Sequence, residues 1–384
     1  MGLRLFTLRL CMESFSFSYR NIKCKVKGEA TSSFRQQLTE GYISPRLQEF
    51  CAYYSNRLSY EEVEKLVERL TGEYLLSDQK IWQIVSNKAL VVSQDIQRNV
   101  METLGQTTSE VVRVNSKVDI YDVEEKEILL FDDGIQVKSQ KAERQSKAKP
   151  DQGKKDQSTL QAKTPVVMTD VVMLQKLTGE FVYITAPTNA EGEDLLSLAT
   201  VVQAKVIQEY GDETRPLNIV AITDGARVIR QRLLAIFEVV VTVILDWYHL
   251  CKKLRQLMSM IAVNKSEKTI HLKFLIPQLW LGLVDNALDY LRTQVAVRNQ
   301  EKWAELIGYL EKHHAEIINY NRRRRAGKTI GSGRMEKGVD LTVGRRQKKK
   351  AMSWRPLGSR SLSLLRIVEL NGQWQQLWFP AQAT

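Results

Sequence analysis

The order of apolar segments between residues 127 and 245 restricts the fold of this chain more than any other feature of the sequence. Three strand-like runs come first, KEILLFDDG, VVMTDVVML and GEFVYITA, and the last two are spaced as a hairpin. An amphipathic helical pattern over 195–206, the apolar run LNIVAITDGA, a second helical segment and the buried run VVVTVIL follow. This order predicts an α/β fold with an open mixed sheet, whose ligands would bind beyond the carboxyl ends of its strands.

Helical patterns flank this region on both sides. Upstream, Ser59 and Glu62 form a capping-box signature, and a second, short helix is expected to start at Ser77. The pair resembles a helix-turn-helix unit in which Lys80 and Gln83 would face DNA, although the long connection between the helices makes a plain helical hairpin an equal alternative. Downstream, residues 250–321 have helical periodicity throughout and are expected to form an all-helical insertion.

These patterns predict five segments along the chain. Residues 12–30 alternate apolar and polar types, as in a strand or hairpin, and residues 139–164 contain a single large aliphatic residue and are expected to form a mobile charged loop. The expected segments are an N-terminal strand or hairpin segment 1–30, a helical DNA-binding region 31–115, a first core part 116–249, a helical insertion 250–328, and a C-terminal core part 329–384.

Positive charge is concentrated in one window. Residues 322–360 contain 14 Lys or Arg against only Glu336 and Asp340, so this window accounts for the whole formal net charge of +12. A polyanion is the expected partner, and a solvated basic face is the alternative. The residues expected to contact DNA phosphates are Arg322, Arg323, Arg324, Arg325, Arg345, Arg346, Lys348, Lys349 and Lys350. The tryptophans that follow, Trp354, Trp374 and Trp378, are expected to pack the closing helices rather than to stack on bases.

The spacing of the cysteines and the hydropathy of the sequence indicate the cellular compartment in which the protein is expected. The four cysteines lie far apart and form no CxxC pair, which argues against a disulfide framework or a zinc site. No apolar run approaches the ~20 residues that span a bilayer. We therefore expect a cytoplasmic protein with no membrane partner.

Three acidic residues stand at positions where strand ends bring carboxylates together. Asp133 closes the first apolar run, Asp224 closes a central one, and Glu336 follows the helical segment. Carboxylates at adjacent strand ends converge at one edge of a sheet, where oxygen ligands suit Mg²⁺, with Mn²⁺ as a substitute. Two such ions would support phosphoryl transfer on nucleic acid. Each acid also has an ordinary alternative, since Asp224 could be a helix N-cap and Asp133 part of an Asp-Gly turn.

The motif series ILLFDDGIQVK, IVAITDGARVI, VILDWYHLCKKL, GSGRMEKGVD and AMSWRPLGSRSLSLLRIVELNGQW resembles that of bacterial insertion-sequence DDE transposases, closest to their mutator-like branch. The resemblance covers roughly residues 128–378 and implies an RNase H-like catalytic domain. It assigns Asp133, Asp224 and Glu336 as the catalytic, metal-binding triad, with Asp132 as an alternative first ligand. Asp246 and His249 match the accompanying Asp-x-x-His element and are implied to take part in catalysis. The ordinary alternative is a helix-capping Asp246 beside a buried His249.

The same resemblance implies a function and its partners. Such a transposase binds the terminal inverted repeats of its element, cleaves DNA strands with a two-metal mechanism and joins the freed ends to target DNA. Holding two ends requires at least a dimer, in the bacterial cytoplasm at the nucleoid. Two alternatives stay open: an inactive or domesticated DNA-binding protein derived from a transposase, and an RNase H-like nuclease.

Overall fold

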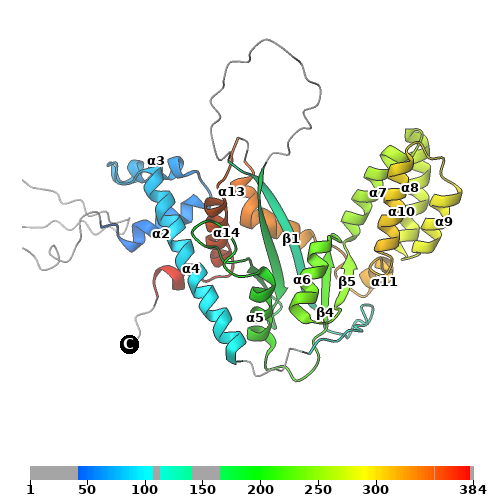
Figure 1. Ribbon diagram of the computed structural model, residues 1–384, viewed down its shortest axis with the longest axis horizontal. Helices are drawn as coiled ribbons and strands as arrows, with labels where there is room; N and C mark the ends of the chain where they lie inside the picture. Colours follow the sequence, from blue (N-terminus) through cyan, green and yellow to red (C-terminus); the bar gives the residue numbers. More distant parts are fainter. Residues whose placement is uncertain (1–41, 107–112, 141–164, 350, 381–384) are drawn as a thin grey trace, which may run out of the picture.

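The computed structural model describes residues 42–106, 113–140, 165–349 and 351–380, and its centre is one five-stranded mixed sheet (Figure 1). The strands lie in the order β3-β2-β1-β4-β5, with β2 antiparallel to both of its neighbours and β1, β4 and β5 parallel. Their bounds are β1 Ile128–Lys138, β2 Val166–Gln175, β3 Phe181–Ile184, β4 Ile219–Thr223 and β5 Thr242–Leu245. The predicted α/β class and the predicted order of strands and helices are confirmed.

Strand β1 is longer than the sequence pattern indicated. It does not end at Asp133 and Gly134 but continues to Lys138, paired with β2 from Leu130↔Leu174 to Lys138↔Val166. The prediction of a strand end at Asp133, and the alternative of an Asp-Gly turn, are therefore wrong. The apolar residues of β2 supply an antiparallel partner that the polar end of β1 alone does not reveal.

Helices cover both faces of the sheet. Helices α5 (Leu198–Tyr210) and α6 (Arg227–Phe237) pack on the face that carries Leu130, Val172 and Ala221. On the other face, which carries Phe131 and Met173, lie α12 (Gly333–Val339) and α14 (Pro356–Leu370). Because side chains alternate along a strand, Asp132 shares a face with Leu130, and Asp133 shares the opposite face with Phe131.

The N-terminal helices are packed against the end of the chain. They are α2 (Pro45–Ser55), α3 (Tyr60–Thr71) and α4 (Asp78–Gln106). The predicted capping box of α3 is confirmed, since Ser59 Oγ accepts from Glu62 N at 3.2 Å and Glu62 Oε2 accepts from Ser59 N at 2.6 Å. The second helix is not short: α4 has 29 residues and packs against α14 (Figure 1). The predicted strand over residues 12–30 and the loop after Gln140 lie outside the described residues.

The helical periodicity predicted over residues 250–321 is confirmed, and the helices of this segment lie beside the sheet (Figure 1). These are α7 (Trp247–Ile261), α8 (Lys265–Trp280), α9 (Val284–Thr293), α10 (Gln300–Lys312) and α11 (Tyr320–Arg325). The chain then closes through α12, the π-helical segment η1 (Asp340–Gly344), α13 (Arg345–Gln347), α14 and α15 (Trp374–Trp378). Over the ranges that the structure describes, no helix has the length and apolar character needed to span a membrane.

Candidate functional site

The parallel pairing of β1 with β4 brings two of the predicted acids together. The pairing ends with Phe131 opposite Ile222, and two residues further along each chain stand Asp133 and Asp224. Adjacent strands lie only about 4.8 Å apart, so the two carboxylates are neighbours at the sheet edge. Glu336 reaches the same place from α12, which packs against β1. Asp133, Asp224 and Glu336 are far apart in the sequence, and the strand pairing together with α12 brings them to the same place in the fold.

The neighbouring carboxylates affect the pKa of Asp133. Partial burial raises the pKa of Asp133, and the carboxylates of Asp224 and Glu336 raise it further. A hydrogen bond from Gly134 N, at 2.8 Å from Asp133 Oδ1, and the nearby His249 oppose the rise in pKa. The net direction is upward, as expected for a carboxyl group in an acidic cluster.

Asp224 is held by the turn that follows β4. Its Oδ1 accepts a hydrogen bond from Ala226 N at 2.8 Å, and Gly225 adopts a φ of +84°. The N-cap of α6 is Ala226, whose side chain makes no capping hydrogen bond, so the alternative of Asp224 as the N-cap residue is wrong. A Cβ at Gly225 would lie 2.4 Å from His313 Cε1. The turn therefore requires glycine both for its conformation and for the close approach of His313.

Asp246 and His249 stand at the start of α7. Asp246 is buried and caps the helix, because its Oδ1 accepts from Tyr248 N at 2.6 Å and from His249 N at 2.9 Å. Its Oδ2 accepts from Ser332 N, which ties α7 to the turn before α12. Burial alone would raise the pKa of Asp246, but the hydrogen bonds from His249 and Ser332 lower it to about 2. Asp246 therefore caps α7, and the alternative of a helix-capping Asp246 is confirmed.

His249 lies between the Asp246 carboxylate and the Glu336 carboxylate of the acidic cluster. Its Nδ1 lies 3.5 Å from Asp246 Oδ1, and its Nε2 lies 4.0 Å from Glu336 Oε1. The Asp246 carboxylate raises the pKa of His249, against partial burial, and the charges of Asp224 and Glu336 raise it further. The imidazole side chain is 29% exposed, so it can reach a ligand at the site. The alternative of a buried His249 is therefore wrong.

Asp132 forms an ion pair with Arg232, away from the acidic cluster. It is buried on the opposite face of β1, where its Oδ1 accepts from Arg232 of α6 at 2.5 Å. The same guanidinium contacts Asp170 of β2. Burial raises the pKa of Asp132 to about 6, although Arg232 opposes the rise. The geometry therefore favours Asp133 over Asp132 as the first ligand.

The three acids have the donor chemistry of a site for a hard divalent cation. In the described ranges, no Lys or Arg forms an ion pair with Asp133, Asp224 or Glu336, so three carboxylates converge without a compensating base other than His249. Oxygen donors of this kind are the preferred ligands of Mg²⁺. The same ranges contain no group of three or more His, Cys, Asp or Glu side chains already close enough together to hold a metal ion. Asp224 and Glu336 are exposed, whereas Asp133 is half-buried.

The predicted phosphate contacts divide into exposed and buried residues. Arg322, Arg324, Arg325, Arg345, Lys348 and Lys349 are exposed, as is Lys80, whereas Gln83 is half-buried. Arg345 is engaged by Asp340 at 2.8 Å. Lys350 lies outside the described residues.

Two predicted DNA contacts are corrected by their burial. Arg323 is 0% exposed and forms two hydrogen bonds to Glu127, at 2.9 and 2.7 Å, and others to backbone carbonyls. Arg346 is 5% exposed, donates to Ser55 O at 2.7 Å and lies over the Trp354 ring. Both guanidinium groups hold segments of the fold together and are closed to DNA. The predicted packing role of Trp354, Trp374 and Trp378 is confirmed, because all three are buried.

The sequence patterns did not reveal a polar network beside Asp224. His313 Nδ1 lies 2.9 Å from an Arg230 guanidinium nitrogen and 2.7 Å from Glu316 Oε2, and Arg230 pairs with Glu316 at 2.5 Å. His313 is 1% exposed. Glu316 O also accepts from Leu245 N at 3.0 Å, directly before Asp246. An i, i+3 His and Glu pair was the only sequence signal for this network, and such pairs are common on helix surfaces.

Comparison with known proteins gives no further identification: no family model, curated protein or solved structure matches this chain.

Proposed function

We propose that this chain is a DDE transposase, an enzyme that cleaves the DNA strands at the ends of a mobile element and joins them to target DNA. The observation that carries the proposal is the meeting of Asp133, Asp224 and Glu336, with His249, at one edge of the sheet. An RNase H-like fold is part of the proposal. It is supported by a sheet of three antiparallel strands extended by two parallel strands, each of which follows a helix.

Asp133, Asp224 and Glu336 would hold Mg²⁺ or Mn²⁺. Bound there, such ions supply activation of an attacking oxygen and stabilisation of the leaving oxygen of a phosphodiester. The half-buried Asp133 provides the fixed wall of the site, because it lies within the paired part of β1. Exposed Asp224 and Glu336 would close on the ligand from the β4 turn and from α12.

His249 would contribute positive charge and a proton. The surrounding carboxylates raise the pKa of His249, so at neutral pH a larger fraction of its imidazole is positively charged than in an ordinary histidine. Its Nε2 faces the Glu336 carboxylate at 4.0 Å, on the side where a phosphate oxygen would lie. We assign it to donate a hydrogen bond to that oxygen and to offset its negative charge.

DNA is the proposed partner, in the form of element ends and a target, and the chain would act as a dimer or a larger assembly. The exposed basic residues Arg322, Arg324, Arg325, Lys348 and Lys349 would contact phosphates, and Lys80 would face DNA from the start of α4. Sequence-independent contacts of this type position the duplex, and end recognition would require base contacts from other residues.

The test is a cleavage and joining assay on linear DNA that carries the repeats bordering the coding sequence, with Mg²⁺ or Mn²⁺. The native chain and Asp212→Ala, which removes an exposed carboxylate outside the cluster, should give metal-dependent joined products. Asp224→Ala should give none while still binding the DNA. Cut but unjoined ends from the native chain would instead indicate a nuclease. Tight binding without cleavage by any of the three proteins would indicate a non-catalytic DNA-binding protein.

A further inference from the structure

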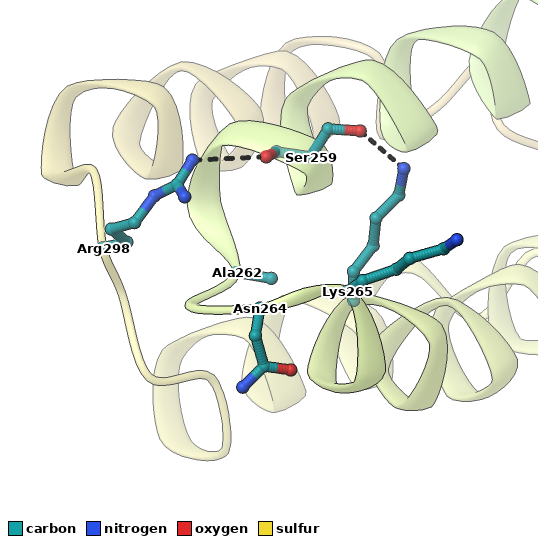
Figure 2. Close-up of a pocket in the computed structure, with 6 residues that line it drawn as sticks. Ser259, Ala262, Asn264, Lys265 and Arg298 are labelled. Atoms are coloured by element: carbon teal, nitrogen blue, oxygen red, sulfur yellow. Dashed lines mark hydrogen bonds between the residues drawn. The ribbon is translucent and has the colours of Figure 1, made fainter.

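A hollow in the helical insertion has basic residues in its lining (Figure 2). None of its lining residues belongs to the acidic cluster. It has a volume of about 240 Å³, and its lining residues are Ser259, Ala262, Asn264, Lys265, Lys268 and Arg298. The end of α7, the start of α8 with the connection between them, and the segment before α10 border it on different sides, with Arg298 and Lys265 opposite each other. The volume equals roughly eight water molecules at ~30 Å³ each, so a phosphate group with part of its hydration shell fits.

Two of the three basic side chains of the hollow donate hydrogen bonds to neutral oxygens. Lys268 Nζ donates to Ser259 Oγ at 2.5 Å, and an Arg298 guanidinium nitrogen donates to Ser259 O at 3.4 Å (Figure 2). Arg298 N also donates to Ile261 O at 2.8 Å, which fixes this segment to the end of α7. Across the described part of the chain, no carboxylate forms an ion pair with Lys265, Lys268 or Arg298. The hollow therefore carries up to three positive charges without a counter-charge.

The nearest acid does not neutralise these charges. Glu267, in the first turn of α8, accepts from Asn264 Nδ2 at 3.4 Å and does not line the hollow. Asn264 Oδ1 caps α8 by accepting from Glu267 N at 2.9 Å. The positive end of the helix dipole thus adds to the positive potential of the three side chains.

We propose that this hollow binds a backbone phosphate of DNA, as a contact separate from the acidic cluster. The proposal rests on the proposed function for the identity of the partner. Lysine, arginine and serine are the side chains that bind phosphate oxygens in protein–DNA interfaces. Asp246 is the N-cap residue of α7, and Ser259 lies 13 residues further along, a rise of about 20 Å. A duplex running along α7 from the acidic cluster would therefore reach the hollow about six base pairs further on, at ~3.4 Å per base pair.

The experiment measures DNA affinity against salt concentration, with the full chain, in EDTA so that no cleavage occurs. The probe is a labelled duplex of mixed sequence about 30 base pairs long, titrated at salt concentrations from about 50 to about 200 mM. Lys268→Gln and Arg298→Gln are compared with Lys273→Gln. Lys273 is exposed on the same helix but lies about 140° around it from Lys268, outside the hollow. Far-ultraviolet circular dichroism confirms that all variants are folded.

Each hollow variant should weaken binding about threefold to tenfold and reduce the slope of log affinity against log salt by about 0.9, the value for one lost phosphate contact. Lys273→Gln should change neither. If the native chain binds and all three variants have the native slope, the hollow is not a DNA contact. If the native chain does not bind the duplex at all, the proposed function fails together with this site.

A second arm separates DNA from a free anion. Inorganic phosphate alone is added to the native chain and to Lys268→Gln, and the thermal midpoint is measured. Phosphate that stabilises the native chain but not the variant, together with unchanged DNA slopes, would assign the hollow to a small anion and overturn the DNA proposal. A smaller slope of log DNA affinity against log salt in the variant supports the proposal, whether or not free phosphate also binds.

Discussion

At the scale of single residues, Asp132 and Asp133 show how one step along a strand separates a structural acid from a candidate ligand. Asp132 points to α6 and is neutralised by Arg232 at 2.5 Å, whereas Asp133 points to α12 and meets two further carboxylates. Alternation of side chains along the strand is the physical cause. The two positions are therefore expected to respond in different ways to the same substitution.

We expect Asp133→Asn to abolish metal-dependent DNA cleavage without lowering stability at pH 7. The pKa of Asp133 is raised in the folded chain above its ordinary value of 3.8, so its ionisation opposes folding. This penalty is present above the folded pKa and disappears as the pH falls through it towards 3.8. The variant should thus be at least as stable as the native chain at pH 7 and lose any advantage near pH 4, as measured by urea unfolding.

The neighbouring Asp132→Asn is the matched control for that prediction. It keeps an oxygen acceptor for Arg232 and leaves the acidic cluster unchanged, so cleavage should persist. Loss of cleavage in Asp132→Asn with full activity in Asp133→Asn would reverse the assignment of the two residues.

Asp246→Asn should destabilise the chain by about 2 kcal/mol at pH 7, because a fall in pKa from 3.8 to about 2 corresponds to roughly 1.4 kcal/mol per pH unit. An amide cannot accept from Tyr248 N, His249 N and Ser332 N together, since one of its two polar atoms is a donor. The stabilisation is fully present above pH 3.8 and is lost as the pH falls through about 2. Urea unfolding at pH 7 and pH 3 measures it, and equal unfolding free energies at pH 7 would contradict it.

At the scale of elements, the helical insertion is docked onto the sheet at β4, which leads to Asp224, and at β5, which leads to Asp246. The segment after α10 contacts the β4 turn through His313 and the end of β5 through Glu316 O and the Tyr320 hydroxyl, which donates to Leu245 O at 2.8 Å. The insertion therefore helps to set the positions of Asp224 and Asp246, besides carrying the hollow.

Gly225→Ala tests this docking. The added Cβ would lie 2.4 Å from His313 Cε1 in a residue whose φ is +84°, so we expect a loss of about 2 kcal/mol or more of unfolding free energy. Gly179→Ala is the matched control, because Gly179 has a φ of +85° with nothing within 4 Å of the added Cβ. Its unfolding free energy should fall only by the cost of the backbone strain, about 1 kcal/mol.

The contribution of His313 to this loss follows from a double-mutant cycle. His313→Ala removes the 2.4 Å contact with the added Cβ, but the contact with Leu245 Cδ1 at 2.9 Å and the backbone strain stay. The combined loss should therefore be smaller than the sum of the two single losses by at least about 0.5 kcal/mol. Additive losses in thermal or urea unfolding would show that His313 does not constrain the β4 turn.

The elements themselves were largely predictable, because apolar runs, capping residues and glycine turns are local signals. The order from β1 to β5 follows from them, as does the capping box of Ser59 and Glu62. The extent of β1 was not predictable, because its polar end is held by β2. Likewise, no local signal distinguishes Arg323 from its neighbours in RRRR, since its partner Glu127 lies 196 residues away in the sequence.

At the scale of the whole molecule, the positive charge is divided between structure and surface. Arg323 and Arg346 are part of the packed interior, and the exposed basic residues of the window remain available to a polyanion. Arg346 also shows that the two ends of the chain share one core, because it joins α13 to Ser55 at the end of α2. The N-terminal helices, which belong to the expected region 31–115, pack on the C-terminal helices.

A fragment of residues 113–384 should therefore fail to unfold cooperatively, whereas the full chain should unfold in one transition. Removal of α2–α4 takes away the helix that packs along α14, the Arg57–Glu369 ion pair and the acceptor Glu49 of the Trp374 indole. Each large apolar side chain newly exposed costs about 1.5–3 kcal/mol, so a few of them equal the typical total stability of ~5–15 kcal/mol. Tryptophan fluorescence and far-ultraviolet circular dichroism should give coincident midpoints for the full chain. A fragment with a native-like midpoint would show that the N-terminal helices form an independent domain.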